Sequence, residues 1–211
     1  MQEVVFENQH FELLPEAAVF WKSKQVLIVA DLHLGKSAHF RSKGFAIPQH
    51  ADAADLEKLE KVINNKSARA LWFLGDLFHS HKNSEWNTFV NWVQRQSIPM
   101  TLIKGNHDVI ATDLFEALGI QVLKRKHEAG ISFTHEPEED NNTPNIAGHL
   151  HPGVAMQEKS LKKHKFSCFY WNNRQLIVPA FGGFTGKHII KPNRKTDKVF
   201  IIANQQVIQY N

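Results

Sequence analysis

The sequence predicts an α/β fold whose parallel first part is followed by a mostly β second part. Strand-length apolar segments alternate with helical patterns as far as Gly119, which is typical of parallel βαβ units. After Ile120, strand-like segments follow one another with little helix between them. The 211 residues, 42% of them hydrophobic, suffice for one sizeable core but not for two, so we expect a single domain over residues 1–211.

The elements of the first part follow from hydrophobic periodicity. Short apolar runs bounded by polar residues indicate buried strands, and longer segments with apolar residues three and four apart indicate helices. The last helix ends on Gly119, a residue type that favours helix ends. In chain order, we expect a strand at 25–31, a helix at 52–65, a strand at 70–76, a helix at 86–96, a strand at 99–104 and a helix at 113–119.

The second part consists of strand-like pieces separated by turns. Such a pattern predicts a second sheet, which we expect to pack face to face on the first. The polar stretches 136–145 and 191–198 are the most loop-like, and the former lies between two histidine motifs. The strand-like pieces are 120–126, 130–136, 145–150, 167–171, 174–180 and 198–210.

The charge is unevenly distributed along the chain. The net charge is +4, yet the residues from Met156 onward carry ten Lys and Arg against two acidic residues, so the first 155 residues are net negative. A basic segment of this kind indicates either an anionic partner such as nucleic acid or a solvated charged face. Both interpretations stay open at this point.

Cysteine usage and apolar runs bear on the compartment. The lone Cys168 excludes an internal disulfide and a zinc site built from cysteines, which suits a reducing environment. The first residues have neither a basic opening nor a long apolar run, and no later stretch reaches membrane-spanning length. We therefore expect a soluble, cytoplasmic protein with no membrane partner, whose oligomeric state stays open.

Polar side chains follow the ends of five predicted strands. Each is a weak signal alone, but all five occur in one chain, which argues against a purely structural role. Carboxylate, imidazole and amide ligands without a thiolate suit divalent ions such as Mn²⁺, Fe²⁺ or Zn²⁺. Asp31 and His33 are two residues apart, so on an extended strand end they share a face and can bind one ion. The strand-end residues are Asp31, His33, Asp76, Asn106, His107, His135, His149 and His151.

These residues are too many for one ion and suffice for two if one carboxylate is shared. Asp76 is the natural bridge, because it stands alone at the end of its strand. The strand-end residues therefore predict metal-assisted chemistry at a site that binds two ions.

The ordered motifs "DLH", "GD", "GNHD", a strand-end histidine and "GHLH" resemble the signature of calcineurin-like metallophosphoesterases, from about Val26 to His151. This resemblance implies a four-layer α/β/β/α sandwich of two mixed sheets. It also implies two divalent ions, with Mn²⁺ as the first expectation and Fe, Zn or Ni as alternatives. The implied ligands are Asp31, His33 and His151 for the first ion and Asn106, His135 and His149 for the second, with Asp76 between the two.

A narrower resemblance covers nearly the full chain. The segments "DLHLGKSAHFRSKGFAIP", "GDLFHS", "THEP" and "PAFGGFTG" are similar to a small bacterial branch, the ligase-associated DNA damage response endonucleases (PdeM). This resemblance implies a phosphate-ester substrate in DNA or RNA, and partners among proteins associated with DNA-repair ligases and helicases.

The same ligands define an expected mechanism. Two ions about 3.5 to 4 Å apart activate a bridging water, and the resulting hydroxide attacks phosphorus in line. His107 is expected to act on the leaving group as a general acid or as a cation, with Asp108 accepting a hydrogen bond from its other ring nitrogen. Lys36, Arg41 and His79 are candidates for substrate binding, although a surface-loop role explains them equally well.

A phosphodiesterase or nuclease acting on nucleic acid or nucleotide phosphodiesters is the favoured function. One alternative is a phosphomonoesterase for small molecules, and another is a metal-stabilised interaction module with incidental activity. His107 favours the enzyme, because a pure binding module has no use for it.

Overall fold

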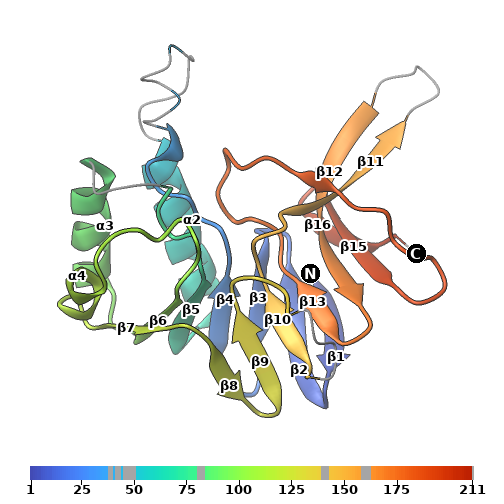
Figure 1. The fold of residues 1–211 in the computed structure, drawn as a ribbon, viewed down its shortest axis with the longest axis horizontal. Coiled ribbons are helices and arrows are strands. Elements are labelled where there is room, and N and C mark those ends of the chain that lie inside the picture. Colours follow the sequence, from blue (N-terminus) through green and yellow to red (C-terminus); the bar gives the residue numbers. More distant parts are fainter. Residues whose placement is uncertain are drawn as a thin grey trace.

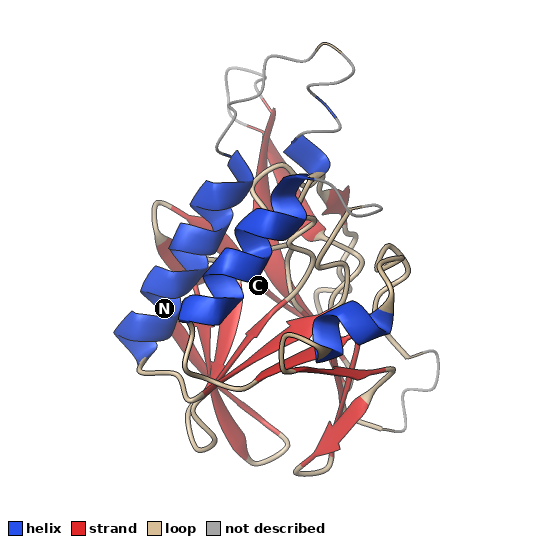
Figure 2. Cartoon of the chain, turned by 90° about the vertical axis from the view of Figure 1, so that its left-hand side faces the viewer, coloured by secondary structure: helices blue, strands red, loops and turns tan. Residues whose placement is uncertain are grey.

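The computed structural model describes residues 1–37, 40, 44, 51–79, 84–138, 143–157 and 163–210. Two mixed β-sheets pack face to face, and the described helices cover the outer side of the first sheet (Figure 1, Figure 2). The predicted α/β class with two mixed sheets is confirmed. None of the described helices is both long enough and apolar enough to cross a membrane.

The first sheet has seven strands in the spatial order β1 to β7. Strands β1 to β4 pair antiparallel and β4 to β7 pair parallel, so a helix lies in each parallel connection. The carboxyl ends of the parallel strands meet at one edge, where α/β proteins place their sites. The bounds are β1 (Gln2–Phe6), β2 (Gln9–Leu14), β3 (Ala18–Trp21), β4 (Val26–Val29), α2 (Ala51–Lys66), β5 (Ala70–Leu74), α3 (Ser84–Arg95), β6 (Met100–Ile103), α4 (Thr112–Glu116) and β7 (Ile120–Leu123).

The strands β1 to β3 have no counterpart in the sequence prediction. They form an antiparallel extension on β4, with Phe11 and Leu13 fully buried. The turn between β1 and β2 places Glu7 and Asn8 at φ of 49° and 61°. Tight hairpins need positive φ at both central residues, which asparagine tolerates and glutamate rarely adopts. The turn therefore carries a weak sequence signal.

The second sheet has nine strands, in the order β14, β11, β12, β13, β10, β9, β8, with β15 beside β12 and β16 beside β15. The predicted strand 120–126 is divided between the sheets, because its first half is β7 and its last residue begins β8. The bounds are β8 (Lys126–Glu128), β9 (Ile131–Thr134), β10 (Asn145–Ala147), β11 (Pro152–Gln157), β12 (Lys163–Asn172), β13 (Gln175–Ile177), β14 (His188–Ile189), β15 (Lys198–Ala203) and β16 (Gln206–Gln209).

Side chains that alternate along the central strands fill two cores. On β4, Leu27 and Val29 pack with the helices, whereas Ile28 packs with the second sheet. The core between the sheets is rich in aromatic residues. The Phe133 ring from the second sheet lies 5.7 Å from Trp21 and 5.0 Å from Trp72, both of the first sheet. Such pairs add about 0.5 to 1.5 kcal/mol each to simple burial, so they fix how the sheets face each other.

The outer face of the second sheet is a smaller apolar cluster. It consists of Val154, Cys168, Val199 and Ile201, with Ile190 packed against it. Within the ranges that the structure describes, no helix covers this face (Figure 1). Within the described residues, α2, α3 and α4 therefore all lie on the outer side of the first sheet.

Cys168 should react slowly with thiol reagents in the native protein. It is fully buried, and burial raises the pKa of its thiol to about 12, so almost none of it is thiolate near neutral pH. Ellman's reagent at about pH 8 is expected to modify it on the order of 10²-fold more slowly than in guanidinium-unfolded protein. Equal rates in the two states would show that the outer face of the second sheet opens readily.

Candidate metal centre

Loops from both sheets meet at the carboxyl edge of the parallel strands. The loop after β4 is tied to the loop after β5, because the N–H groups of Asp31 and His33 donate to Gly75 O and Asp76 O at 3.2 and 2.9 Å. The second sheet joins at the same place through a parallel bridge between Ala30 and Ala180. The backbone thus holds the candidate ligands of both sheets at one seam before any metal binds.

Most of the candidate ligands have a left-handed backbone. The expectation that Asp31 and His33 share the face of an extended strand end is wrong, since β4 ends at Val29. Left-handed φ costs of order 1 to 3 kcal/mol for a non-glycine residue and concentrates at functional sites. Aspartate and histidine tolerate it better than most residues. Positive φ values of 46° to 68° occur at Asp31, His33, Asp76, His149 and His151.

The first group of ligands contains Asp31, His33 and His151. One ligand atom from each lies within 4.8 Å of the others. The Nε2 atoms of the two imidazoles are 3.4 Å apart, and Nε2 of His151 is 3.3 Å from Oδ1 of Asp31. Asp31 is fixed by its other oxygen, which accepts the backbone N–H of His149 at 2.9 Å.

The second group contains Asp76, His135 and His149, again within 4.8 Å. Nε2 of His135 lies 3.1 Å from Nδ1 of His149 and 3.0 Å from the side-chain oxygen of Asn106. The other ring nitrogen of His135 donates to Leu74 O at 2.9 Å, which fixes the ring with Nε2 facing the group. Asn106 thus brings its amide oxygen to this group.

Asp76 lies between the two groups. Its Oδ2 is 3.8 Å from Nε2 of His33, and its Oδ1 is 3.4 Å from Nε2 of His135. Oδ1 also accepts the backbone N–H of His107 at 2.9 Å. One carboxylate therefore faces both groups with different oxygens, which is the geometry of a bridging ligand.

Asp76 and His135 shift each other's pKa in opposite directions. Burial acts against the charged carboxyl, but the hydrogen bond and charge of His135 outweigh burial and lower the pKa of Asp76 to about 2. Burial also disfavours a charged His135, yet Asp76 reverses this and raises its pKa to about 9. Burial and the charge of Lys36 lower the pKa of His33 to about 3. Asp76 therefore favours the protonated form of His135, whereas a histidine binds a metal ion in its neutral form.

The donor set fits divalent ions. Oδ1 of Asp31 is buried and, among the described residues, has no hydrogen-bond donor as a partner. A buried carboxylate oxygen without a donor is costly unless a cation satisfies it. The set offers imidazole, carboxylate and amide oxygen, and Cys168 lies on the far face of the second sheet. This chemistry suits Mn²⁺, Fe²⁺ or Zn²⁺ better than a soft ion.

Gly105 is required by the approach of the "GNHD" loop to Asp76. A Cβ atom at this position would lie 2.3 Å from Oδ1 of Asp76 and 2.5 Å from its backbone nitrogen. No side chain can occupy that space unless the carboxylate moves. The glycine therefore allows the loop after β6 to bring Asn106 and His107 against the bridging residue.

The expected hydrogen bond between Asp108 and the His107 ring is wrong. Both oxygens of Asp108 accept backbone N–H groups instead, from Gly105 at 2.9 Å and from Leu77 and Phe78 at 2.9 and 3.2 Å. Burial raises the pKa of Asp108 to about 6, against the effect of these donors. Asp108 is 2% exposed and joins the loops after β5 and β6, so it acts as a positioning residue.

The remaining candidates lie around the first group. The exposed His107 ring stacks on His79 at 5.6 Å and lies edge-on to His33 at the same distance. Lys36 is half-buried, and burial lowers its pKa while the charges of Asp31 and Asp76 oppose that shift. His79 and Lys36 therefore lie beside the ligand residues, His79 against the His33 ring and Lys36 within the field of Asp31 and Asp76. Arg41 lies outside the described residues.

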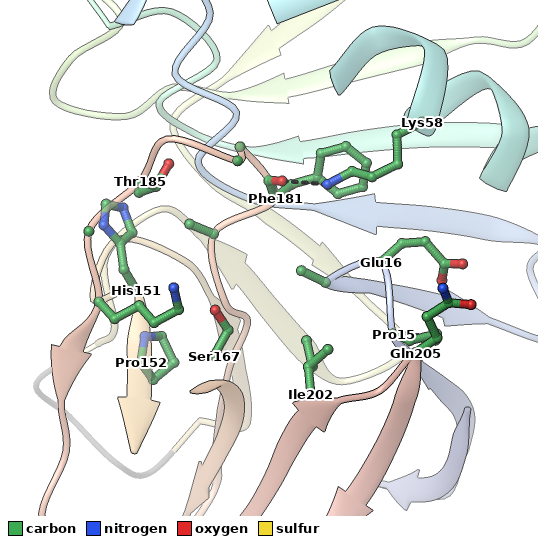
Figure 3. A pocket seen from close by; sticks show the side chains of 16 residues that line it. Pro15, Glu16, Lys58, His151, Pro152, Ser167, Phe181, Thr185, Ile202 and Gln205 are labelled. Atoms are coloured by element: carbon green, nitrogen blue, oxygen red, sulfur yellow. Dashed lines mark hydrogen bonds between the residues drawn. The ribbon is translucent and has the colours of Figure 1, made fainter. Parts of the chain in front are cut away.

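One supporting contact was not predicted from the sequence. Lys58 of α2 donates from Nζ to Phe181 O at 2.7 Å and lies 3.7 Å from the centre of the Phe181 ring (Figure 3). The next residue, Gly182, donates to Asp31 O, and a Cβ there would lie 2.2 Å from Leu32 O. Lys58 thus holds the loop after β13 against the "DLH" loop. The glycine pair in "PAFGGFTG" was the one visible hint.

Comparison with known proteins decides the family. Residues 24–206 match the family model of the calcineurin-like phosphoesterases. The chain belongs to this family. It is a metal-dependent phosphoric ester hydrolase with two candidate metal sites. None of the curated proteins matches it in sequence.

Solved structures of similar proteins include a nuclease. The Pseudomonas putida nuclease MPE is 27% identical, with a TM-score of 0.83, and the match covers 99% of this chain and 98% of that one. The Escherichia coli phosphoesterase Yfce is 15% identical, with a TM-score of 0.43 over 87% of this chain and 96% of that one. A protein of unknown function from Aquifex aeolicus, AQ665, is 18% identical, with a TM-score of 0.44 over 60% and 78%. Among these three structures, only MPE has a TM-score above 0.5.

Proposed function

We propose that this phosphoesterase is a two-metal phosphodiesterase that acts on nucleic acid or nucleotide phosphodiesters, with Mn²⁺ as its metal and Fe, Zn or Ni as alternatives. The observation that carries the proposal is Asp76, whose two oxygens face two separate groups of ligands. The likeness to a nuclease along the whole chain supports a diester substrate. A role in DNA repair, with ligase- or helicase-associated partners in the cytoplasm, is part of the same proposal.

Different residues of the chain have different roles in the proposed reaction. When bound, two divalent ions supply activated water and neutralise charge on the phosphoryl group. Asp76 and Asn106 fix the geometry of the ligand groups, and Asp108 holds their loops together. The His107 ring, beside His33, is placed to give a proton to the leaving oxygen or to stabilise its charge. Lys36 places a cation near the same region.

A pair of chromogenic substrates tests the function. With Mn²⁺, bis(p-nitrophenyl) phosphate should be hydrolysed, EDTA should abolish the activity, and Mn²⁺ in excess should restore it. Oligonucleotides of single-stranded DNA, duplex DNA and RNA, together with cyclic nucleotides, then define the natural diester. Hydrolysis of p-nitrophenyl phosphate alone would replace the proposal by a phosphomonoesterase. No metal-dependent turnover of either ester would leave only a metal-stabilised binding module.

A further inference from the structure

A recess opens beside the first group of ligands (Figure 3). Its volume of about 490 Å³ falls within the range of small-molecule sites, roughly 300 to 1,000 Å³. His151 and Thr185 lie on one side, and Glu16 and Gln205 lie on the opposite side. The walls therefore come from both sheets, from α2 and from the loop after β13.

His151 belongs both to the recess and to the first ligand group. The recess therefore borders the metal centre at His151. The group esterified to a phosphate at the metal centre must extend away from it in some direction, and the recess offers this group a partly open volume beside His151. Thr185 lines the recess beside His151, and its hydroxyl is buried without a hydrogen-bond partner in the described chain.

The walls of the recess are suited to an organic group. They are poorly suited to a further phosphate group of the substrate, beyond the one at the metal centre. Pro15, Pro152 and Ile202 supply apolar surface, and Ser167 and Gln205 supply a hydroxyl and an amide. Such a mixture matches a heterocyclic base, which has apolar faces and a polar edge.

The cations of the recess do not form a phosphate site. Nζ of Lys58 already donates to Phe181 O and lies 3.8 Å from Asp55. Burial lowers the pKa of Lys58, which further weakens it as an anion ligand. Lys187 is exposed, and Glu16 adds a carboxylate to the lining of the same recess. A second phosphate would therefore find one solvated cation and a nearby anion, whereas a neutral base meets no such penalty.

We infer that this recess binds the nucleoside attached to the scissile phosphate, with Ser167 and Gln205 at the polar edge of its base. The inference rests on the proposed function, since it names the part of the substrate that the metal centre does not hold. It assigns substrate recognition to the recess lined by α2, the β2–β3 turn and the β15–β16 turn.

Ser167→Phe should block the recess without touching a metal ligand. Ser167 lies on β12 opposite Gly153, so a phenylalanine suits the strand and fills the space beside it. Lys165→Phe is the matched control, because Lys165 is on the same strand two residues away, is exposed and does not line the recess. Gln205→Asn is a milder second variant, since asparagine tolerates the φ of 57° at this turn.

Two readouts separate the recess from the metal centre. Saturation-transfer NMR with thymidine 5′-monophosphate in EDTA should show contact to the base protons in the wild type and in Lys165→Phe, and none in Ser167→Phe. With Mn²⁺, kcat/KM for thymidine 5′-(p-nitrophenyl phosphate) should fall roughly tenfold or more in Ser167→Phe and less in Gln205→Asn. The same constant for methyl p-nitrophenyl phosphate should change by less than about twofold.

The outcomes distinguish two failures. Unchanged base contacts in Ser167→Phe, or equal losses on both substrates in a variant that melts like the wild type, would overturn the nucleoside site. If Ser167→Phe does not fold, Gln205→Asn decides, and equal behaviour towards both esters would count against the inference. A wild type that contacts the base but hydrolyses neither diester would refute the proposed function and leave the nucleoside site standing.

Discussion

Replacing Asp76 by asparagine should lower metal-dependent phosphodiester turnover by at least about 10³-fold. Loss of a single group in a preorganised charged site already costs about 10² to 10³ in kcat. Here the substitution also removes an anion whose two oxygens face the two ligand groups. The pKa of Asp76 is about 2, because the hydrogen bond and charge of His135 outweigh the effect of burial. The wild-type carboxylate is therefore ionised throughout the neutral pH range. An amide can turn only one oxygen towards one group, and its NH₂ repels a cation.

Metal content is the readout that separates this effect from a simple loss of fold. The wild type should bind two Mn²⁺ per chain, and Mn²⁺ should raise its melting temperature, because a ligand that binds the native state stabilises it. Asp76→Asn should bind one ion or none and should lose most of that shift. Asp113→Asn is the control, since Asp113 is exposed at the start of α4 and an amide oxygen can keep its bond to Leu114 N. Two ions and full turnover in Asp76→Asn would refute the bridging assignment.

The alternation of β4, α2, β5, α3 and β6 could be predicted because local periodicity encodes it. The strands consist mostly of buried apolar residues, with Thr101 as a buried polar exception in β6, and α3 has apolar residues at helical spacing. The antiparallel extension β1 to β3 was missed, since its signal is a turn chemistry that glutamate obscures at Glu7. The division of 120–126 between two sheets was missed too. Which sheet a strand joins depends on contacts remote in sequence, and no local pattern records them.

The candidate site shows the same division between local and remote information. The residue types at strand ends are visible in the sequence, and the structure brings all seven proposed ligands to one seam. The left-handed backbone at Asp31, His33 and Asp76 is not visible, because nothing in a motif such as "DLH" states a dihedral angle. The role of Asp108 was mistaken for a related reason. Two of its partners are backbone N–H groups of Leu77 and Phe78, about 30 residues away, and a sequence does not show which remote backbone donors lie near a carboxylate.

Replacing His107 by alanine should lower turnover by roughly 10² to 10⁴ while both ions stay bound. The imidazole is not a member of either ligand group and lies exposed between His33 and His79. What His107 contributes to the ligands is its backbone N–H, which donates to Asp76 and is kept by alanine. The variant should therefore lose chemistry on the substrate and keep the metal centre, as measured by Mn²⁺ content and turnover on one sample.

The size of that loss should depend on the leaving group. A p-nitrophenolate leaves as a stable anion and needs little help, whereas the alkoxide of a nucleotide sugar needs a proton or a nearby positive charge. His107→Ala should accordingly impair an oligonucleotide or dinucleotide far more than bis(p-nitrophenyl) phosphate. His127→Ala, at an exposed histidine of β8, should leave both rates unchanged. Equal losses on the two substrates would mean that His107 positions the phosphate, and loss of metal would place the imidazole among the ligands.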